Sequence, residues 1–215
     1  MKLLGGKEIF ETLDELVLPK HTALLIHDMQ NDFCAPSGKL FDKVGEAKES
    51  VRESIRQTRE LLDSARRAGV MVAFSRASHF PGGTDESPVH LHHLLRRGQR
   101  GGEPNVVIGT WGHEIVSELA PQAGELVFDK FSFSCFQGTV LEKMLKLRSI
   151  RTIVLTGVAS HSGVLTAARV ATTLDYYLVV PRQCIAGTDA KQHEAAMELL
   201  GPDVYAKDDI VKLWG

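Results

Sequence analysis

Three features of the sequence combine residue types and positions that are suited to catalysis. Asp28 and Lys130 each follow a short apolar run, and Gly163 closes a turn that also follows such a run. A carboxylate at the end of an apolar strand is partly desolvated, and beside an ammonium group it can act as a general acid or base. The alternatives are a turn-forming aspartate and a lysine that extends along the surface to keep its charge in water.

The turn at residues 156–163 lies between a predicted strand and a predicted helix. A nucleophile at Gly163 would stand at a helix N-terminus, where free N–H groups and the helix dipole stabilise an anion. Glycine has no side chain to supply it. Ser162 and Cys135 are the possible substitutes. Ser162 needs a neighbouring base, and Cys135 is expected to pack as a small apolar group.

Histidines are frequent near these features. His161 lies two residues before Gly163, and it either contacts substrate or bonds to the backbone. His90, His92 and His93 lie close together, with Asp85 nearby. A mononuclear zinc site needs three or four converging ligands, and no pair has the His-x-x-x-His spacing on a predicted helix. We therefore expect no metal and interpret this stretch as a solvated loop.

Composition limits the class of protein. The chain has 215 residues, 43% of them hydrophobic, and a formal net charge of −2. These values predict a single α/β domain over 1–215 and no binding of nucleic acid or of an anionic membrane surface. The three cysteines predict neither a disulfide framework nor a thiol zinc site. No signal-peptide pattern or membrane span is evident, so we expect a soluble cytoplasmic protein.

Apolar runs alternate with helical patterns along the chain. Strands are expected at 23–27, 70–74, 125–128, 152–155, 177–180 and 203–206, and helices at 46–68, 114–119, 138–148, 163–175 and 189–200. This order predicts a three-layer α/β/α, Rossmann-like fold with a mostly parallel sheet of about six strands. Ligands bind beyond the carboxyl ends of such strands, where the three features converge. Residues 78–111 are expected to form a long irregular excursion.

Several segments together resemble the isochorismatase-like hydrolases. They are Leu24–Phe33, Glu114–Pro121, Asp129–Thr139, Thr156–Ala159 and Cys184–Gly187, in this order along most of the chain. The resemblance implies homodimers or homotetramers and an Asp-Lys-Cys triad. Its aspartate corresponds to Asp28, its lysine to Lys130 and its cysteine to Gly163. A cis peptide near Val158 and Ala159 is implied as well, and it would help to shape an oxyanion hole.

The missing thiol narrows the implied chemistry. Isochorismatases of the aryl-acid and phenazine pathways also tend to carry glycine here, with a histidine two residues before it. They cleave a vinyl ether, and the resemblance makes Asp28 the acid, lets Lys130 orient it, and leaves space above Gly163 for substrate or water. No cofactor is implied, because the nicotinamidase metal motif is not matched at residues 75–81. The substrate-binding positions that we expect for a small molecule are Gln30, Phe33, Arg76, His79, Phe133 and His161.

Three hypotheses follow. The leading one is a thiol-independent hydrolase that uses Asp28, Lys130 and activated water to break a vinyl-ether or related C–O or C–N bond. The second is a non-catalytic protein that binds a small molecule in the retained pocket. The third is a cysteine amidohydrolase whose nucleophile has been replaced at Gly163.

Overall fold

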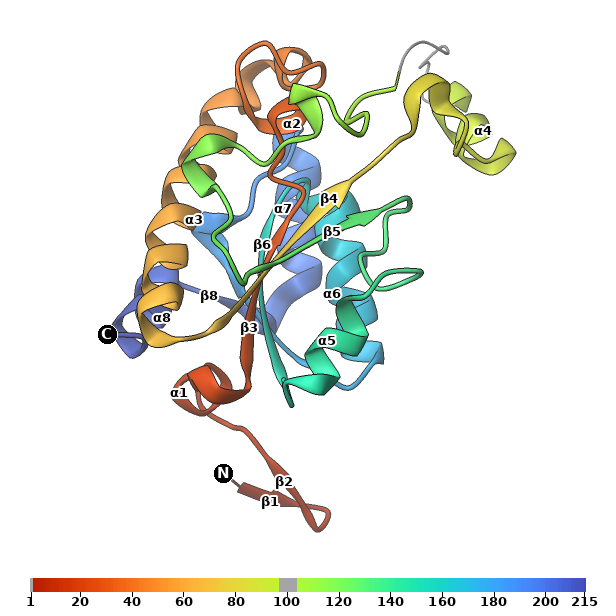
Figure 1. The fold of residues 1–215 in the computed structure, drawn as a ribbon. Helices are drawn as coiled ribbons and strands as arrows, with labels where there is room; N and C mark the ends of the chain where they lie inside the picture. Colours follow the sequence, from red (N-terminus) through yellow and green to blue (C-terminus); the bar gives the residue numbers. More distant parts are fainter. Residues whose placement is uncertain (1, 97–103) are drawn as a thin grey trace.

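A six-stranded sheet forms the centre of the computed structural model, which describes residues 2–96 and 104–215 (Figure 1). The strands lie in the order β5-β4-β3-β6-β7-β8, and every neighbouring pair is parallel. Their bounds are β3 Thr22–His27, β4 Met71–Ala77, β5 Leu126–Lys130, β6 Thr152–Gly157, β7 Tyr177–Pro181 and β8 Val204–Tyr205. The expected parallel sheet is therefore confirmed.

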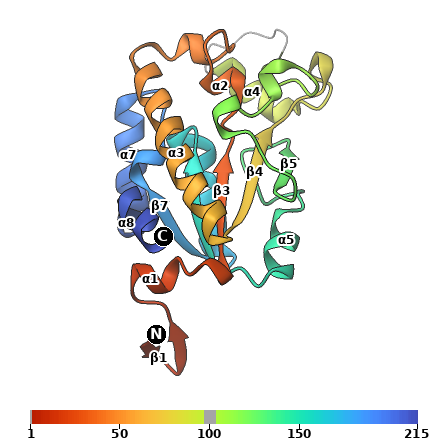
Figure 2. The ribbon, with the colours of Figure 1, turned by 60° about the vertical axis from the view of Figure 1, so that its left-hand side comes forward.

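Helices cover both faces of the sheet and make the three layers. The helices are α1 Leu13–Leu16, α2 Asn31–Cys34, α3 Lys48–Ala68, α4 Pro88–Arg96, α5 Leu141–Leu147, α6 Leu165–Thr173, α7 Ala190–Leu200 and α8 Lys207–Leu213. Helices α3 and α8 lie on one face, and α5, α6 and α7 contribute to the core on the other (Figures 1 and 2). A small hairpin of β1 Lys2–Leu4 and β2 Lys7–Ile9 projects from the opposite end to α4 (Figure 1).

The central strand β3 shows why the sheet takes this form. Leu24 and Ile26 pack into the core under α3, whereas Ala23 and Leu25 pack into the core on the other face. Successive side chains of a strand point to opposite faces, so an uninterrupted apolar run satisfies both layers at once. All six residues of β3 are buried, which makes the position after it a desolvated one.

Two sequence expectations need correction. The helix expected at 114–119 is only a short 3₁₀ turn at Ser117–Leu119, because Ile115 forms an antiparallel bridge with Gln30 instead. The excursion at 78–111 is not wholly irregular, because it contains α4. Residues 97–103 of that excursion lie outside the described residues.

The register of the strands brings distant residues to one edge. His27, the last residue of β3, pairs with Ser75 on one side and Gly157 on the other. Lys130, the last residue of β5, pairs with Ala77. One edge of the sheet therefore contains the carboxyl ends of β3, β4, β5 and β6. The candidate residues Asp28 and Lys130 lie at this edge. Within the described residues, no helix combines the length and apolarity needed to cross a membrane.

Candidate active site

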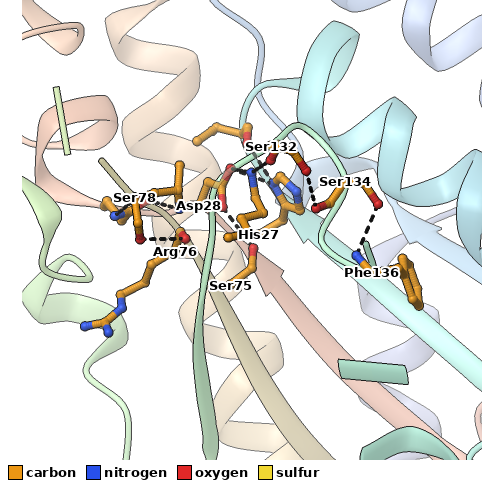
Figure 3. Close-up of polar contacts among 12 residues, drawn as sticks. His27, Asp28, Ser75, Arg76, Ser78, Ser132, Ser134 and Phe136 are labelled. Atoms are coloured by element: carbon orange, nitrogen blue, oxygen red, sulfur yellow. Dashed lines mark hydrogen bonds and ion pairs between the residues drawn. The ribbon is translucent and has the colours of Figure 1, made fainter. Parts of the chain in front are cut away.

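Asp28 and Lys130 form an ion pair at this edge of the sheet. The Lys130 Nζ lies 2.8 Å from Asp28 Oδ2, and the two side chains are only 3% and 8% exposed. Ser75 Oγ donates to the other carboxylate oxygen at 2.9 Å, and Lys130 Nζ also donates to the carbonyl of Ser132 at 3.0 Å (Figure 3). A buried ion pair is costly unless such additional hydrogen bonds satisfy it. The arrangement fixes the Asp28 carboxyl group in a site shielded from water.

The backbone of Asp28 is also unusual. Its φ is 54°, in the left-handed region that residues with a side chain seldom occupy. The conformation is held because Asp28 N donates to the Ser75 carbonyl at 3.1 Å. Such conformations cluster at functional sites, where surrounding contacts maintain them. Here the turn at Asp28 redirects the chain directly after β3.

His27 is a residue in this site that sequence reasoning missed, and Ser75 is another. The His27 ring is fully buried, and its Nδ1 lies 3.2 Å from the Val158 carbonyl and 3.3 Å from Asp28 Oδ2. Both partners are acceptors when Asp28 is ionised, so Nδ1 carries the proton. Burial lowers the pKa of His27 to about 4, against an opposing effect of Asp28, and the ring is therefore neutral at neutral pH. Its buried Nε2 has no hydrogen-bond partner among the described residues.

The His27 imidazole occupies the space beside Gly163. A Cβ built at Gly163 would overlap His27 Cε1 and lie 3.2 Å from both ring nitrogens, whereas real Cβ atoms stay beyond 3.0 Å. The φ of Gly163 is outside the left-handed region, so glycine is required here for space and not for backbone conformation. This corrects the expectation that Gly163 leaves room for substrate or water. The space is filled by an imidazole from the neighbouring strand.

The turn before Gly163 contains two further specialised features. Gly157 has a φ of 128°, and a Cβ there would overlap the His27 carbonyl. The Val158–Ala159 peptide is cis, as the family resemblance implied. The chain then forms a single π-helical turn at Ser160–Val164 that leads into α6. Single π turns are frequent at functional sites.

Two of the predicted substrate-binding residues have other partners. Gln30 is fully buried, and its amide bonds to the carbonyls of Ala77 and His113 and to Ala77 N, at 2.8–2.9 Å. Gln30 therefore links the end of β4 to the segment at His113, and these bonds occupy its amide. The Arg76 Nε donates to Asp129 at 2.8 Å, and its guanidinium points away from Asp28 (Figure 3).

The remaining predicted substrate-binding residues are spread around the edge. Phe33 packs partly buried against the core under α3. Phe133 is 46% exposed and lies beside the rings of His90 and His93. His161 is partly buried within the π-helical turn. Their roles in substrate binding stay predictions.

The cysteines do not offer a replacement nucleophile. Cys34, Cys135 and Cys184 are all buried, and burial raises the pKa of each thiol, to about 12 for Cys135 and Cys184. A thiol with a raised pKa supplies almost no thiolate near neutral pH, and the thiolate is the reactive form.

One signal in the sequence could have found His27. It is a histidine that ends a strand whose other residues are mostly apolar, directly before the candidate acid. A neutral imidazole in that position has to be accommodated by a neighbour without a side chain. The missing side chain at Gly163 was visible in the sequence, but its pairing with His27 depends on the register between β3 and β6.

The fold is a three-layer α/β/α domain with candidate polar residues at the carboxyl edge of its sheet, and a family comparison shows its class. The family model of the isochorismatase domain matches residues 22–205. The chain therefore belongs to the isochorismatase family, in agreement with the resemblance of its motifs.

Solved structures agree with this assignment. An isochorismatase family protein from Desulfovibrio vulgaris subsp. vulgaris is 29% identical, with a TM-score of 0.74 over 89% of this chain and 98% of that one. The N-carbamoylsarcosine amidase from Thermoplasma acidophilum is 26% identical, with a TM-score of 0.69 over 87% and 96%. A cysteine hydrolase from Pseudomonas syringae pv. phaseolicola shares the fold at 22% identity, with a TM-score of 0.76 over 91% and 93%.

Proposed function

We propose that this protein hydrolyses a small molecule without a thiol nucleophile, with Asp28 as the group that gives and receives the proton. The observation that carries the proposal is the buried Asp28–Lys130 pair beside a glycine whose nucleophile space is filled by His27. The acid-base half of the family triad is intact, whereas the thiol half is replaced by an imidazole. Chemistry that needs no covalent enzyme intermediate fits this combination.

Cleavage of a vinyl ether is the reaction that this site suits best. In its protonated form, the Asp28 carboxyl group donates its proton to the terminal alkene carbon, which leaves an oxocarbenium ion and the Asp28 carboxylate. Water adds to the cationic carbon and returns a proton to Asp28, and the hemiketal then collapses to an alcohol and a carbonyl compound. Lys130 and Ser75 hold the two carboxyl oxygens in place through both proton transfers. A related C–O or C–N bond is cleaved by the same sequence of steps.

In this proposal His27 is a positioning residue. Its Nδ1 lies within reach of Asp28 Oδ2 and of the Val158 carbonyl, so the ring links the acid to the turn of β6. A neutral imidazole orients the carboxyl group without adding a second positive charge beside Lys130. The unpartnered Nε2 is an acceptor, which suits a water molecule near the acid.

The test is turnover of vinyl-ether, amide and ester panels by the protein and by Asp28→Asn. Loss of a general acid or base is expected to lower kcat/KM by about 10²–10⁴-fold. Asp203→Asn is the matched control, because Asp203 is a partly buried carboxylate on a remote turn. Equal activity of Asp28→Asn and the parent protein would reject the proposal. Circular dichroism of both variants shows that the fold is kept.

A second candidate, a non-catalytic binding protein, is favoured by the absence of a nucleophilic side chain at Gly163. Asp28 and Lys130 are 6% and 4% exposed, and the imidazole fills the space beside Gly163. Such a protein would retain a ligand that mass spectrometry recovers unchanged. Any turnover that depends on Asp28 rejects this candidate. The replaced-cysteine hypothesis is disfavoured, because a cysteine at Gly163 requires His27 to move.

A further inference from the structure

A second group of chemically capable side chains lies in the excursion after β4, apart from the Asp28 site. His79, Glu86 and His90 each offer one ligand atom, and these three atoms all lie within 4.8 Å of one another. We propose that these residues bind one divalent transition-metal ion, for which Zn²⁺ is the best match. The inference goes beyond the proposed hydrolase chemistry and does not depend on it.

The donor set is the first argument. Two imidazole nitrogens and one carboxylate oxygen are the ligand types of mononuclear zinc sites in which a fourth position stays open. Donor atoms around a tetrahedral zinc ion are roughly 3.3 Å apart, given metal–ligand distances near 2.0 Å. The Glu86 Oε1 and His90 Nε2 atoms are already 3.8 Å apart. Because all three atoms lie within 4.8 Å of one another, closing the site needs the donor atoms to approach by at most about 1.5 Å, which side-chain torsions can supply.

Asp85 provides the second argument. Its Oδ2 accepts a hydrogen bond from His79 Nδ1 at 2.9 Å, and its Oδ1 accepts one from Phe80 N at 2.8 Å. The proton on Nδ1 leaves Nε2 of His79 with its lone pair available for a metal. Metal-binding histidines commonly have a carboxylate on their other nitrogen, which fixes the tautomer and orients the ring. Asp85 is itself anchored by the backbone, so it can hold His79 in one orientation.

The backbone that carries the ligands is the third argument. His79 is tied to the neighbouring loop, since its N donates to the Val106 carbonyl and its carbonyl accepts from Ile108 N. Glu86 lies just before α4, and His90 follows it by four residues, with His90 N bonded to Ser87 Oγ at 3.1 Å. The two side chains point toward one another, because Glu86 Oε1 lies 3.8 Å from His90 Nε2. The three ligands thus come from two supported elements.

The helix α4 explains why the sequence indicated no metal. The histidines at 90–93 were interpreted as part of a solvated loop, whereas His90 lies in the first turn of α4 at the end of the molecule beyond β4 (Figure 1). The side chains of His79, Glu86 and His90 are 18%, 14% and 31% exposed, so the group is half-buried yet accessible to an ion.

The test is titration of the untagged, chelator-treated protein with ZnCl₂ by isothermal calorimetry, with metal content measured after dialysis. One equivalent of zinc is expected. Glu86→Gln and His90→Gln are each expected to weaken binding by at least 100-fold. Asp85→Asn is expected to weaken it by about 10–100-fold, because it releases the other nitrogen of His79. His92→Gln is the matched control on α4, since His92 is exposed and outside the group.

Several outcomes would overturn the proposal. They are the absence of zinc binding by the parent protein, unchanged binding by Glu86→Gln, and equal loss in His92→Gln. Circular dichroism excludes unfolding as the cause of any loss. Asp28→Asn is expected to retain full zinc binding, so failure of the metal site and failure of the hydrolase proposal give different results.

Discussion

Two buried lysines in this molecule face different surroundings. Lys130 and Lys207 are each only 4% exposed, and each pairs with a carboxylate. The partner of Lys130 is Asp28, whose side chain is 8% exposed. The partners of Lys207 are Glu60 and Asp208, which are 48% and 66% exposed. In the pair of Asp28 and Lys130 both charged groups are buried. In the pairs of Lys207 the carboxylates are exposed to solvent.

We expect this difference between a pair that functions in catalysis and a pair that only stabilises the fold. Burial lowers the pKa of Lys207, but hydrogen bonds to Glu60 and Asp208 outweigh that effect and raise it overall. Lys207 thereby links α8 to α3, and its two carboxylate partners stay exposed to water. The pair of Asp28 and Lys130 has both charges desolvated, which a fold maintains at a cost to stability. A stability cost of this kind is what we expect of a pair that takes part in catalysis.

The largest effect on stability is expected from Lys130→Met. Removing one partner of a buried ion pair leaves the other charge uncompensated and costs about 3–5 kcal/mol of unfolding free energy. Lys207→Met is expected to cost about 1 kcal/mol, because Glu60 and Asp208 remain in water. Urea denaturation of both variants measures the difference. Equal losses would remove the distinction between the two pairs, and Asp28→Asn combined with Lys130→Met is expected to recover part of the larger loss.

A smaller effect, about 1–3 kcal/mol, is expected from Gly163→Ala. The added methyl group overlaps the His27 ring, and overpacking of a filled site has this magnitude. Ser162→Ala, in the same turn, is the control and is expected to change stability little. A double-mutant cycle with His27→Ala tests the cause, since the alanine at 163 then has space. Additive losses in that cycle would show that His27 and Gly163 do not compete for the same volume.

The most gradual effect concerns the pH dependence of stability. The pKa of His27 is lowered from 6.5 to about 4 in the folded protein. Between pH 6.5 and pH 4, the unfolded chain therefore binds a proton at this histidine and the folded chain does not. Stability is therefore greatest above pH 6.5 and falls as the pH drops towards 4, by at most about 1.4 kcal/mol per pH unit. His27→Gln is expected to flatten this slope more than His193→Gln, whose pKa burial also lowers. Equal slopes for the two variants would show that the pH dependence of stability does not come from His27.

Local patterns in the sequence predicted the sheet and the ion pair well. The apolar runs predicted all six strands, and the ends of two of them predicted the meeting of Asp28 and Lys130. Parallel strands bring their carboxyl ends to one edge, so residues far apart in sequence can be placed together without knowledge of side-chain contacts.

Local sequence patterns could not predict that the His27 ring lies in the space beside Gly163. This placement depends on the register of β3 against β6 and on the side-chain volume between them, which neither periodicity nor composition contains. The helix α4 was missed for a different reason. The glycines and prolines around it, at 81–83, 88 and 101–104, are typical of turns and loops and obscure a short helix between them.

The central claim is that the chemistry depends on Asp28 and on no thiol. It is tested most directly by measuring kcat/KM, on whichever substrate of the panel is turned over, for a variant with Cys34, Cys135 and Cys184 all changed to alanine. The account predicts that this folded variant keeps its activity and that adding Asp28→Asn lowers it by about 10²–10⁴-fold. Loss of activity in the folded cysteine-free variant, or its persistence after Asp28→Asn, would contradict the account.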